Sequence, residues 1–268
     1  MVEFNENKLC RICTSNLQDA FDAVVIKKYT AKILYCPNCG LLQVANPTWV
    51  GKAYLEVIAL SDTGLVMRNV GLSKKLIPLL FHLFGNGGRY VDFAGGTGLL
   101  VRLMRDAGHD FYWDDPYCMN VHARGFEFVA DSSSYNVVTA FEVLEHILDP
   151  IDFFSNAINK THTGILIFST ELYEGIPPKP EEWEYYNFDE GQHISFYQKK
   201  TLIFIADKLG LKYNSLGQLH IFYQDKYTDL FTGYFNSRLI RKIANYKAIG
   251  GLKSKTMSDS LMLRGKGK

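Results

Sequence analysis

The sequence lacks long hydrophobic runs and an excess of charge of either sign, and each absence excludes a class of protein. No run of about 18 apolar residues occurs, so no membrane-spanning helix is expected. The N-terminus does not join a basic stretch to an apolar one, as an export signal would. The net charge is +1 over 268 residues, which gives no general attraction to nucleic acid. We therefore predict a cytoplasmic protein without a nucleic-acid partner.

Cysteine is also scarce, but four of the five cysteines form two closely spaced pairs. The pairs are Cys10 with Cys13, and Cys36 with Cys39. Two such turns, joined by the strand-like segment from Val24 to Tyr35, can complete a closed tetrahedral zinc site. Disulfides are the alternative, which the lack of an export signal disfavours. We predict a structural zinc ion in a zinc-ribbon module over residues 1–45, because so short a segment cannot fold on apolar burial alone.

A glycine-rich turn follows a short apolar run, and an acid lies just before it. Residues 90–93 read as a buried strand, and apolar residues recur at helical spacing from Leu99 onward. Glycines at such a crossing let the backbone approach a ligand closely. Asp92 would repel a pyrophosphate but suits S-adenosylmethionine, which has an ammonium, a sulfonium and no phosphate. The predicted cofactor-binding residues are Asp92, Ala94, Gly95, Gly96 and Gly98.

A second acid follows the next candidate strand, residues 110–113. Asp115 lies 17 positions beyond Gly98, close to the spacing at which an acid binds ribose hydroxyls. We predict Asp115 as the ribose ligand. Asp114 takes that role if the register shifts by one residue, and a plain turn at Asp114 to Pro116 is the structural alternative.

The glycine turn resembles the first motif of the Rossmann-like S-adenosylmethionine-dependent methyltransferases, which reads acid-x-Gly-x-Gly-x-Gly. Ala94 replaces the first glycine, so we expect a negative φ there. The resemblance implies an α/β fold with a seven-stranded sheet over residues 46–268. We expect strands at residues 211–223 and 258–263, with a helical insertion near residues 227–247 between them.

The sequence Phe-Glu-Val-Leu-Glu-His at residues 141–146 resembles the segment after the fourth strand in the small-molecule branch of that family. The resemblance implies that Phe141 and Glu142 line the cofactor, and it makes Asp131 a candidate adenine contact. Glu145 and His146 fit two interpretations. They either join a catalytic or metal site or, as we prefer, cap and anchor the next helix. Asp149 and Pro150 are predicted as the N-cap and first-turn residues of that helix.

The cysteine pairs together with these motifs resemble the sugar methyltransferases, including C-methyltransferases of nucleotide-linked keto sugars. This resemblance implies a small carbohydrate-type acceptor, with Tyr54 at the methionine end of the cofactor and His193 as the catalytic base. Gln192 stands where those enzymes have glutamate, so it cannot hold a charge. Two alternatives are an RNA methyltransferase that uses the zinc ribbon, and a non-catalytic scaffold, which the departures at Ala94 and Gln192 would explain.

The segment from Glu171 to Gln192 lacks helical or strand periodicity, and we expect it to be a loop over the carboxyl ends of the strands. Its aromatic residues form either a wall for a sugar ring or base, or anchors that hold the loop; they are Trp183, Tyr185, Tyr186 and Phe188.

Overall fold

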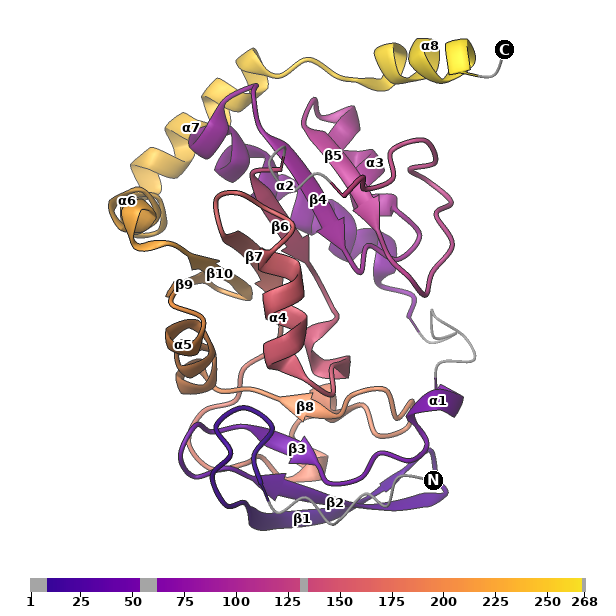
Figure 1. Ribbon diagram of the computed structural model, residues 1–268, viewed down its shortest axis with the longest axis vertical. Coiled ribbons are helices and arrows are strands. Elements are labelled where there is room, and N and C mark those ends of the chain that lie inside the picture. Colours follow the sequence, from indigo (N-terminus) through magenta and orange to yellow (C-terminus); the bar gives the residue numbers. More distant parts are fainter. Residues whose placement is uncertain (1–8, 54–61, 131–134, 267–268) are drawn as a thin grey trace.

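The computed structural model describes residues 9–53, 62–130 and 135–266. A six-stranded sheet lies in the middle of the molecule, and a four-stranded sheet, formed mainly by residues 18–44, lies at one end (Figure 1). Among the described helices, none has the length and apolar character needed to cross a membrane.

The larger sheet has the strand order β5-β4-β6-β7-β10-β9. Its strands are β4 (Arg89–Phe93), β5 (Asp110–Asp114), β6 (Val137–Ala140), β7 (Ile165–Ser169), β9 (Lys212–Leu216) and β10 (Leu219–Tyr223). The first four strands of that order are parallel, whereas β10 is antiparallel to both β7 and β9. Every residue of β6 and β7 is buried, as expected for parallel strands that are covered on both faces.

Helices cover both faces of this sheet. One face packs on α2 (Leu65–Phe84), α3 (Leu99–Asp106), α6 (Thr228–Asn236) and α7 (Arg238–Gly251). The other face packs on α4 (Pro150–Ile158) and α5 (Lys199–Lys208). Strand alternation produces this division: in β7, Ile165 and Ile167 join the first set, while Leu166 and Phe168 join the second.

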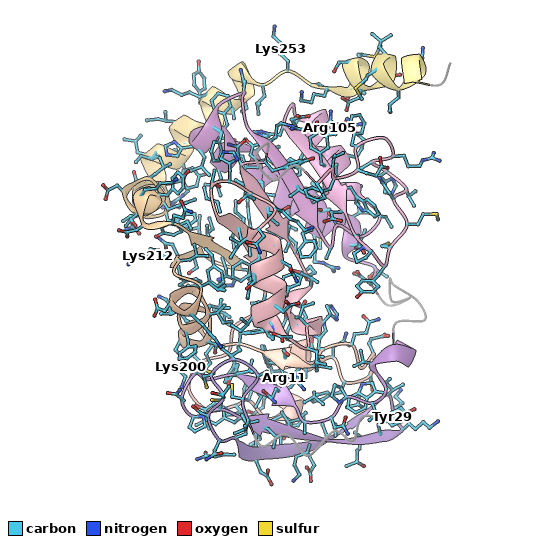
Figure 2. The ribbon with its side chains drawn as sticks, viewed as in Figure 1. Arg11, Tyr29, Arg105, Lys200, Lys212 and Lys253 are labelled. Atoms are coloured by element: carbon cyan, nitrogen blue, oxygen red, sulfur yellow. The ribbon has the colours of Figure 1, made fainter. Side chains whose placement is uncertain are left out.

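The prediction of a seven-stranded sheet is wrong for the described residues. Residues 258–263 lie within a helix, α8 (Thr256–Lys266), and residues 211–223 form the hairpin of β9 and β10 instead of one strand. A short apolar run such as Leu261 to Leu263 does not distinguish strand from helix. The Asp259 carboxylate of this helix binds the Arg105 guanidinium through two contacts of 2.8 Å, which hold α8 against α3. Arg105 lies near the top of the view in Figure 2.

Residues 227–247, expected to hold a helical insertion, form most of α6 and α7. They are followed by α8 and not by a strand, so among the described residues they do not lie between two strands of the sheet. In Figure 1, α7 and α8 follow the outer edge of the molecule, far from the N-terminal sheet.

The four-stranded sheet is antiparallel, with the order β1-β2-β3-β8. Its strands are β1 (Gln18–Val25), β2 (Tyr29–Tyr35), β3 (Leu42–Val44) and β8 (Ser195–Phe196). The segment expected to be strand-like is therefore part of the β1–β2 hairpin. The last strand comes from far along the chain, so the sheet is completed only when both parts of the chain meet. A short helix, α1 (Val50–Ala53), follows β3.

The turns that carry the cysteines pack directly on α5. The Thr201 hydroxyl donates to the Cys39 carbonyl at 2.7 Å, and the Lys208 ammonium donates to the Ile12 carbonyl at 3.0 Å. Arg11 and Lys200 lie at this junction (Figure 2). Cys10, Cys36 and Cys39 share one buried cluster with the apolar face of α5, so the cysteine turns are part of the main core.

Candidate functional site

The predicted cofactor residues that the structure describes meet at one edge of the six-stranded sheet. Parallel strands end together, so the segments after β4, β5 and β6 emerge side by side. These segments carry the glycine turn, Asp115, and Phe141 with Glu142, respectively. Tyr54 and Asp131 lie outside the described residues.

Three residues of the glycine turn have a left-handed backbone, Ala94, Gly96 and Gly98, and the first of them precedes the glycines. Ala94 has φ +58°, so the expectation of a negative φ is wrong. The reason is the pairing with β5: the amides of Ala94 and Gly95 both donate to the Asp114 carbonyl, at 2.8 and 3.4 Å. A methyl side chain at positive φ costs about 1–2 kcal/mol, which these hydrogen bonds help to offset.

The three glycines differ in what surrounds them. A Cβ on Gly95 would lie 3.0 Å from an Asp92 carboxylate oxygen, and one on Gly98 would lie 2.9 Å from Asn120 Oδ1. A Cβ on Gly96 would meet no atom within 4 Å, although its φ is +53°. Gly95 and Gly98 are therefore needed for packing inside the protein, whereas Gly96 faces open space where a ligand can approach the backbone.

Asp92 lies beneath this turn and is only 4% exposed. The Thr139 hydroxyl donates to its Oδ1 at 2.6 Å. Burial raises the pKa of Asp92 to about 7; the neighbouring Asp115 adds to this shift, and the Thr139 hydrogen bond opposes it. A cation next to the turn would favour the charged form of Asp92, whereas a phosphate would disfavour it.

Asp115 and Asp114 point to different partners. Asp115 Oδ2 accepts the Gly96 amide at 2.9 Å, and its Oδ1 accepts the amides of Tyr117 and Cys118. The Asp114 carboxylate instead lies 2.7 Å from the Lys160 ammonium. Alternation along the strand thus directs Asp115 toward the glycine turn and Asp114 away from it.

Glu142 also has a left-handed backbone, with φ +54°. Its amide donates to Ser169 Oγ at 3.0 Å, and that hydroxyl donates to Glu142 Oε1 at 2.8 Å. Arg68 Nε lies 3.6 Å from Glu142 Oε2. The Glu142 side chain is still 44% exposed, although partial burial and nearby Glu145 raise its pKa. Strained backbone held by several contacts is typical of a functional site.

Glu145 and His146 do not cap the next helix. Asp149 does so, since its carboxylate accepts the Asp152 amide at 3.0 Å with Pro150 at the first position of α4, as predicted. Glu145 and His146 lie instead in a 3-10 turn, Leu144–His146, that faces His193. Our preferred interpretation of these two residues is therefore wrong.

His193 is held between this turn and the N-terminal sheet. The adjacent Ile194 amide donates to the Glu145 carbonyl at 2.8 Å, and the Ile194 carbonyl accepts the Val44 amide at 3.0 Å. The His193 Nδ1 contacts the Tyr185 carbonyl at 2.6 Å, and its ring lies 4.9 Å from that of His146.

His146 and Glu145 are titratable groups held away from water. Burial lowers the pKa of His146 to about 3, and His193 adds to this shift, so His146 is a neutral imidazole near neutral pH. Glu145 is 1% exposed, and burial raises its pKa. Gln192, which replaces the expected glutamate, accepts the His146 Nδ1 hydrogen through its backbone carbonyl at 3.1 Å.

The aromatic residues of the loop after β7 mainly hold that loop on the four-stranded sheet. Tyr186 is fully buried and stacks on Phe188, and Trp183 packs against both Tyr186 and Phe196. Only Tyr185 of this group reaches the histidines, with its ring 4.9 Å from that of His193. The anchoring interpretation is therefore confirmed for Trp183, Tyr186 and Phe188.

The four cysteines of the two closely spaced pairs lie together as free thiols, with no disulfide between them. Cys10 Sγ lies 3.5 Å from Cys39 Sγ, and Cys13 Sγ lies 3.3 Å from Cys36 Sγ. All four sulfurs lie within 4.8 Å of one another, compared with about 3.8 Å between thiolates around a tetrahedral zinc ion. Burial raises the pKa of Cys36 to about 11, so four thiolates would coexist here only with a cation to balance their charge. The residues fit zinc.

A family model described as a methyltransferase domain matches residues 68–216, which is more than half of the chain. The chain belongs to this family. The matched residues hold the glycine turn, Asp115, Glu142 and His193, so all of these lie within an S-adenosylmethionine-dependent methyltransferase domain.

Solved structures that resemble the chain include three methyltransferases. Mitomycin 7-O-methyltransferase MmcR shares 16% identity over 66% of this chain and 60% of its own, with a TM-score of 0.43. Human N-acetylserotonin methyltransferase shares 11% over 66% and 65%, with a TM-score of 0.44. Magnesium protoporphyrin IX methyltransferase of Synechocystis PCC 6803 shares 12% over 67% and 96%, with a TM-score of 0.41. The match thus spans less than two thirds of the first two proteins. No curated protein sequence matches this chain.

Sequence reasoning missed several residues of the methyltransferase domain that position the site. Thr139 and Ser169 lie at the ends of β6 and β7, and each hydrogen-bonds a predicted carboxylate. Each is a polar residue near the end of an otherwise apolar strand, and this pattern could have indicated a role in the site. Arg68 reaches Glu142 from α2 and had no such signal, because only the packing of α2 brings it near.

Proposed function

We propose that this protein transfers the methyl group of S-adenosylmethionine to a small carbohydrate or nucleotide-sugar acceptor. The observation that carries the choice of cofactor is the pair of carboxylates at the glycine turn, Asp92 beneath it and Asp115 bonded to the Gly96 amide. Two acids at one turn suit a ligand with an ammonium, a sulfonium and ribose hydroxyls better than a pyrophosphate.

Each predicted cofactor residue has a role in this proposal. Gly96 leaves room for the cofactor against the backbone, and Ala94, Gly95 and Gly98 shape the turn around that opening. Asp115 accepts the ribose hydroxyls. Phe141 and Glu142 line the reacting end, and the resemblance to the sugar methyltransferases assigns Tyr54 to the methionine end. Methyl transfer is a direct displacement, so most of the rate comes from holding nucleophile, methyl carbon and sulfur in line, worth up to about 7–11 kcal/mol.

His193 is the proposed base that removes the acceptor proton. Because its Nδ1 contacts a carbonyl oxygen, the hydrogen lies on Nδ1 and the lone pair lies on Nε2, as a base requires. Glu145 provides a carboxylate beside this histidine in place of the one that Gln192 lacks. A base is needed if the nucleophile is a hydroxyl or a carbon beside a keto group.

The carbohydrate acceptor is supported by the combination of cysteine pairs, glycine turn and Glu-Val-Leu-Glu-His segment, which resembles the sugar methyltransferases. A zinc ion on Cys10, Cys13, Cys36 and Cys39 belongs to the same proposal, as does a zinc-ribbon module over residues 1–45. So does a location in the cytoplasm, where thiols stay reduced. The zinc would have a structural role, because four thiolates leave no open position.

The test is incubation with S-adenosylmethionine labelled in the methyl group and separate pools of nucleotide sugars and RNA. We expect label in the sugar pool and a loss of at least about tenfold in rate for His193→Gln. Label in RNA alone would refute the acceptor. No transfer and no heat of cofactor binding would favour the non-catalytic scaffold.

A further inference from the structure

A compact group of metal-ligating side chains lies beside the proposed acceptor site. One atom each from the Glu145 carboxylate and the rings of His146 and His193 lie within 4.8 Å of one another. Glu145 and His146 come from the turn after β6, and His193 comes from the segment before β8. The fold brings these two segments together, although 46 residues separate His146 from Gln192, whose carbonyl contacts the His146 ring.

Both imidazole rings contact a backbone carbonyl through Nδ1, a feature that they share with metal-binding histidines. The Nδ1 of His146 contacts the Gln192 carbonyl at 3.1 Å, and the Nδ1 of His193 contacts the Tyr185 carbonyl at 2.6 Å. A carbonyl oxygen only accepts, so each Nδ1 carries the hydrogen and each Nε2 keeps its lone pair. Histidines that bind metals almost always donate the other ring hydrogen to a carbonyl or carboxylate, which fixes the tautomer and the ring direction.

The carboxylate at this site has one unsatisfied oxygen, although nearby His193 and Arg68 favour its charged form. Glu145 is 1% exposed, and its Oε2 has no hydrogen-bond partner in the part of the chain that the structure describes. His146 Nε2 lies 3.9 Å from the other oxygen, Oε1. A buried polar atom without a partner is costly, and a cation coordinated by this oxygen would remove that cost. A second carboxylate, that of Glu142, opposes the charge of Glu145, and the Arg68 guanidinium, 3.6 Å from Glu142, offsets part of this repulsion.

We propose that Glu145, His146 and His193 bind one divalent transition-metal ion. Two imidazoles and one carboxylate suit Mn²⁺, Fe²⁺, Co²⁺ or Zn²⁺, and three protein ligands leave positions open for water or for oxygens of the acceptor. The site differs chemically from the cysteine site, whose four thiolates select zinc and leave no position open. The ion would orient the acceptor oxygen next to the methyl donor.

The location of the acceptor at this ion rests on the proposed function, but binding of the ion does not. The two roles of His193 exclude each other in one molecule, because a lone pair given to a metal cannot accept a proton. The base role therefore applies only to the metal-free protein.

The experiment titrates the full chain, loaded with only one zinc ion per chain for the four-cysteine site, with Mn²⁺ and follows free Mn²⁺ by electron paramagnetic resonance. We expect one Mn²⁺ per chain, with zinc content unchanged, and binding at least tenfold weaker in Glu145→Gln and in His193→Gln. Glu174→Gln is the matched control, since Glu174 is an exposed carboxylate of the neighbouring loop, and it should bind as the unchanged protein does.

The outcomes separate the two proposals. Absence of Mn²⁺ binding, or equal affinity in all three variants, would overturn the metal site. Thermal unfolding of each variant without Mn²⁺ establishes that it is folded, and Mn²⁺ should raise the melting temperature of the unchanged protein and Glu174→Gln but not of Glu145→Gln. Mn²⁺ binding without any methyl transfer would support the metal site and count against the proposed reaction. Equal activity with and without Mn²⁺ would overturn the role of the ion in orienting the acceptor.

Discussion

At the residue scale, the site is built from side chains and backbone conformations that stability alone would disfavour. Ala94 and Glu142 both have left-handed backbone, and Asp92 and Glu145 are buried carboxyl groups. Each is held by a specific neighbour, such as the Asp114 carbonyl for Ala94 and the Thr139 hydroxyl for Asp92. Strained backbone and buried charge each cost folding free energy, and their occurrence together at one edge of the sheet is typical of a binding site.

Asp92 should make the stability of the ligand-free protein depend on pH. Its pKa in the folded protein is about 7, compared with 3.8 when exposed, so folding favours the protonated form. The stabilising effect is complete below pH 3.8 and is lost as the pH rises through about 7, which amounts to at most about 4 kcal/mol. Asp92→Asn should therefore be more stable than the unchanged protein at pH 8 and similar to it at pH 4, as measured by urea unfolding.

The same substitution should weaken cofactor binding, because a cationic donor favours the charged form of Asp92. Calorimetry at pH 6.5 in buffers of different ionisation enthalpy should detect proton release on binding in the unchanged protein but not in Asp92→Asn. Equal proton release in both proteins would show that another group titrates.

Gly96 offers a sharper test of where the cofactor lies. Gly96 and Gly217 both have left-handed backbone, φ +53° and +62°, with no atom within 4 Å of an added Cβ. Gly96→Ala and Gly217→Ala should therefore lose similar stability, about 1 kcal/mol or less after the entropy change of the unfolded chain. Only Gly96→Ala should weaken S-adenosylmethionine binding, by at least about tenfold, as measured by calorimetry. Equal affinities in the two variants would place the cofactor elsewhere.

At the element scale, the turn from β6 to α4 carries both structure and chemistry. β6 ends at Ala140, and α4 begins at Pro150 with Asp149 as its cap. The nine residues between them provide Phe141, Glu142, Glu145 and His146. A well-fixed start for α4 therefore also fixes the direction of the side chains before it.

We expect Asp149→Ala to destabilise the protein by about 0.5–2 kcal/mol, because the Asp152 amide loses its partner. Asp149→Asn should retain nearly full stability, since an amide oxygen accepts the same hydrogen bond. Urea unfolding of the two variants measures the difference. If both variants lose the same stability, the charge of Asp149 matters more than the cap.

At the scale of the whole molecule, the four-stranded sheet and the methyltransferase domain share one core. β8 completes the N-terminal sheet, and the cysteine turns pack on α5. The segment that ends in β8 also carries His193, so the position of the proposed base depends on that sheet. Loss of the cysteine site should consequently lower the stability of both the four-stranded sheet and the methyltransferase domain.

Removal of zinc should lower the melting temperature of the whole protein, on the order of 10 °C, because four buried thiols would remain without a cation. Cys36→Ser should have the same effect and should reduce the zinc content. Cys118→Ser is the matched control, since the fifth cysteine lies outside the cluster, and it should change neither quantity. A chelator that leaves the melting temperature unchanged would contradict a structural zinc ion.

The sequence by itself determined the elements whose signals are local. The strand, glycine turn and helix from Arg89 to Asp106 follow from apolar periodicity and glycine, and the start of α4 follows from Asp149 and Pro150. The pairing of Cys10 with Cys13 and of Cys36 with Cys39 follows from their spacing, because each pair lies in a single turn. These features need only residues that are close together in the chain.

Tertiary structure alone decided the features that depend on distant segments. The left-handed conformation of Ala94 depends on a carbonyl of β5, and the position of α8 against α3 depends on the ion pair of Asp259 with Arg105. The meeting of Glu145 and His146 with His193 depends on β8 joining the N-terminal sheet. In each case the contact joins residues far apart in sequence, so the local sequence alone cannot predict it.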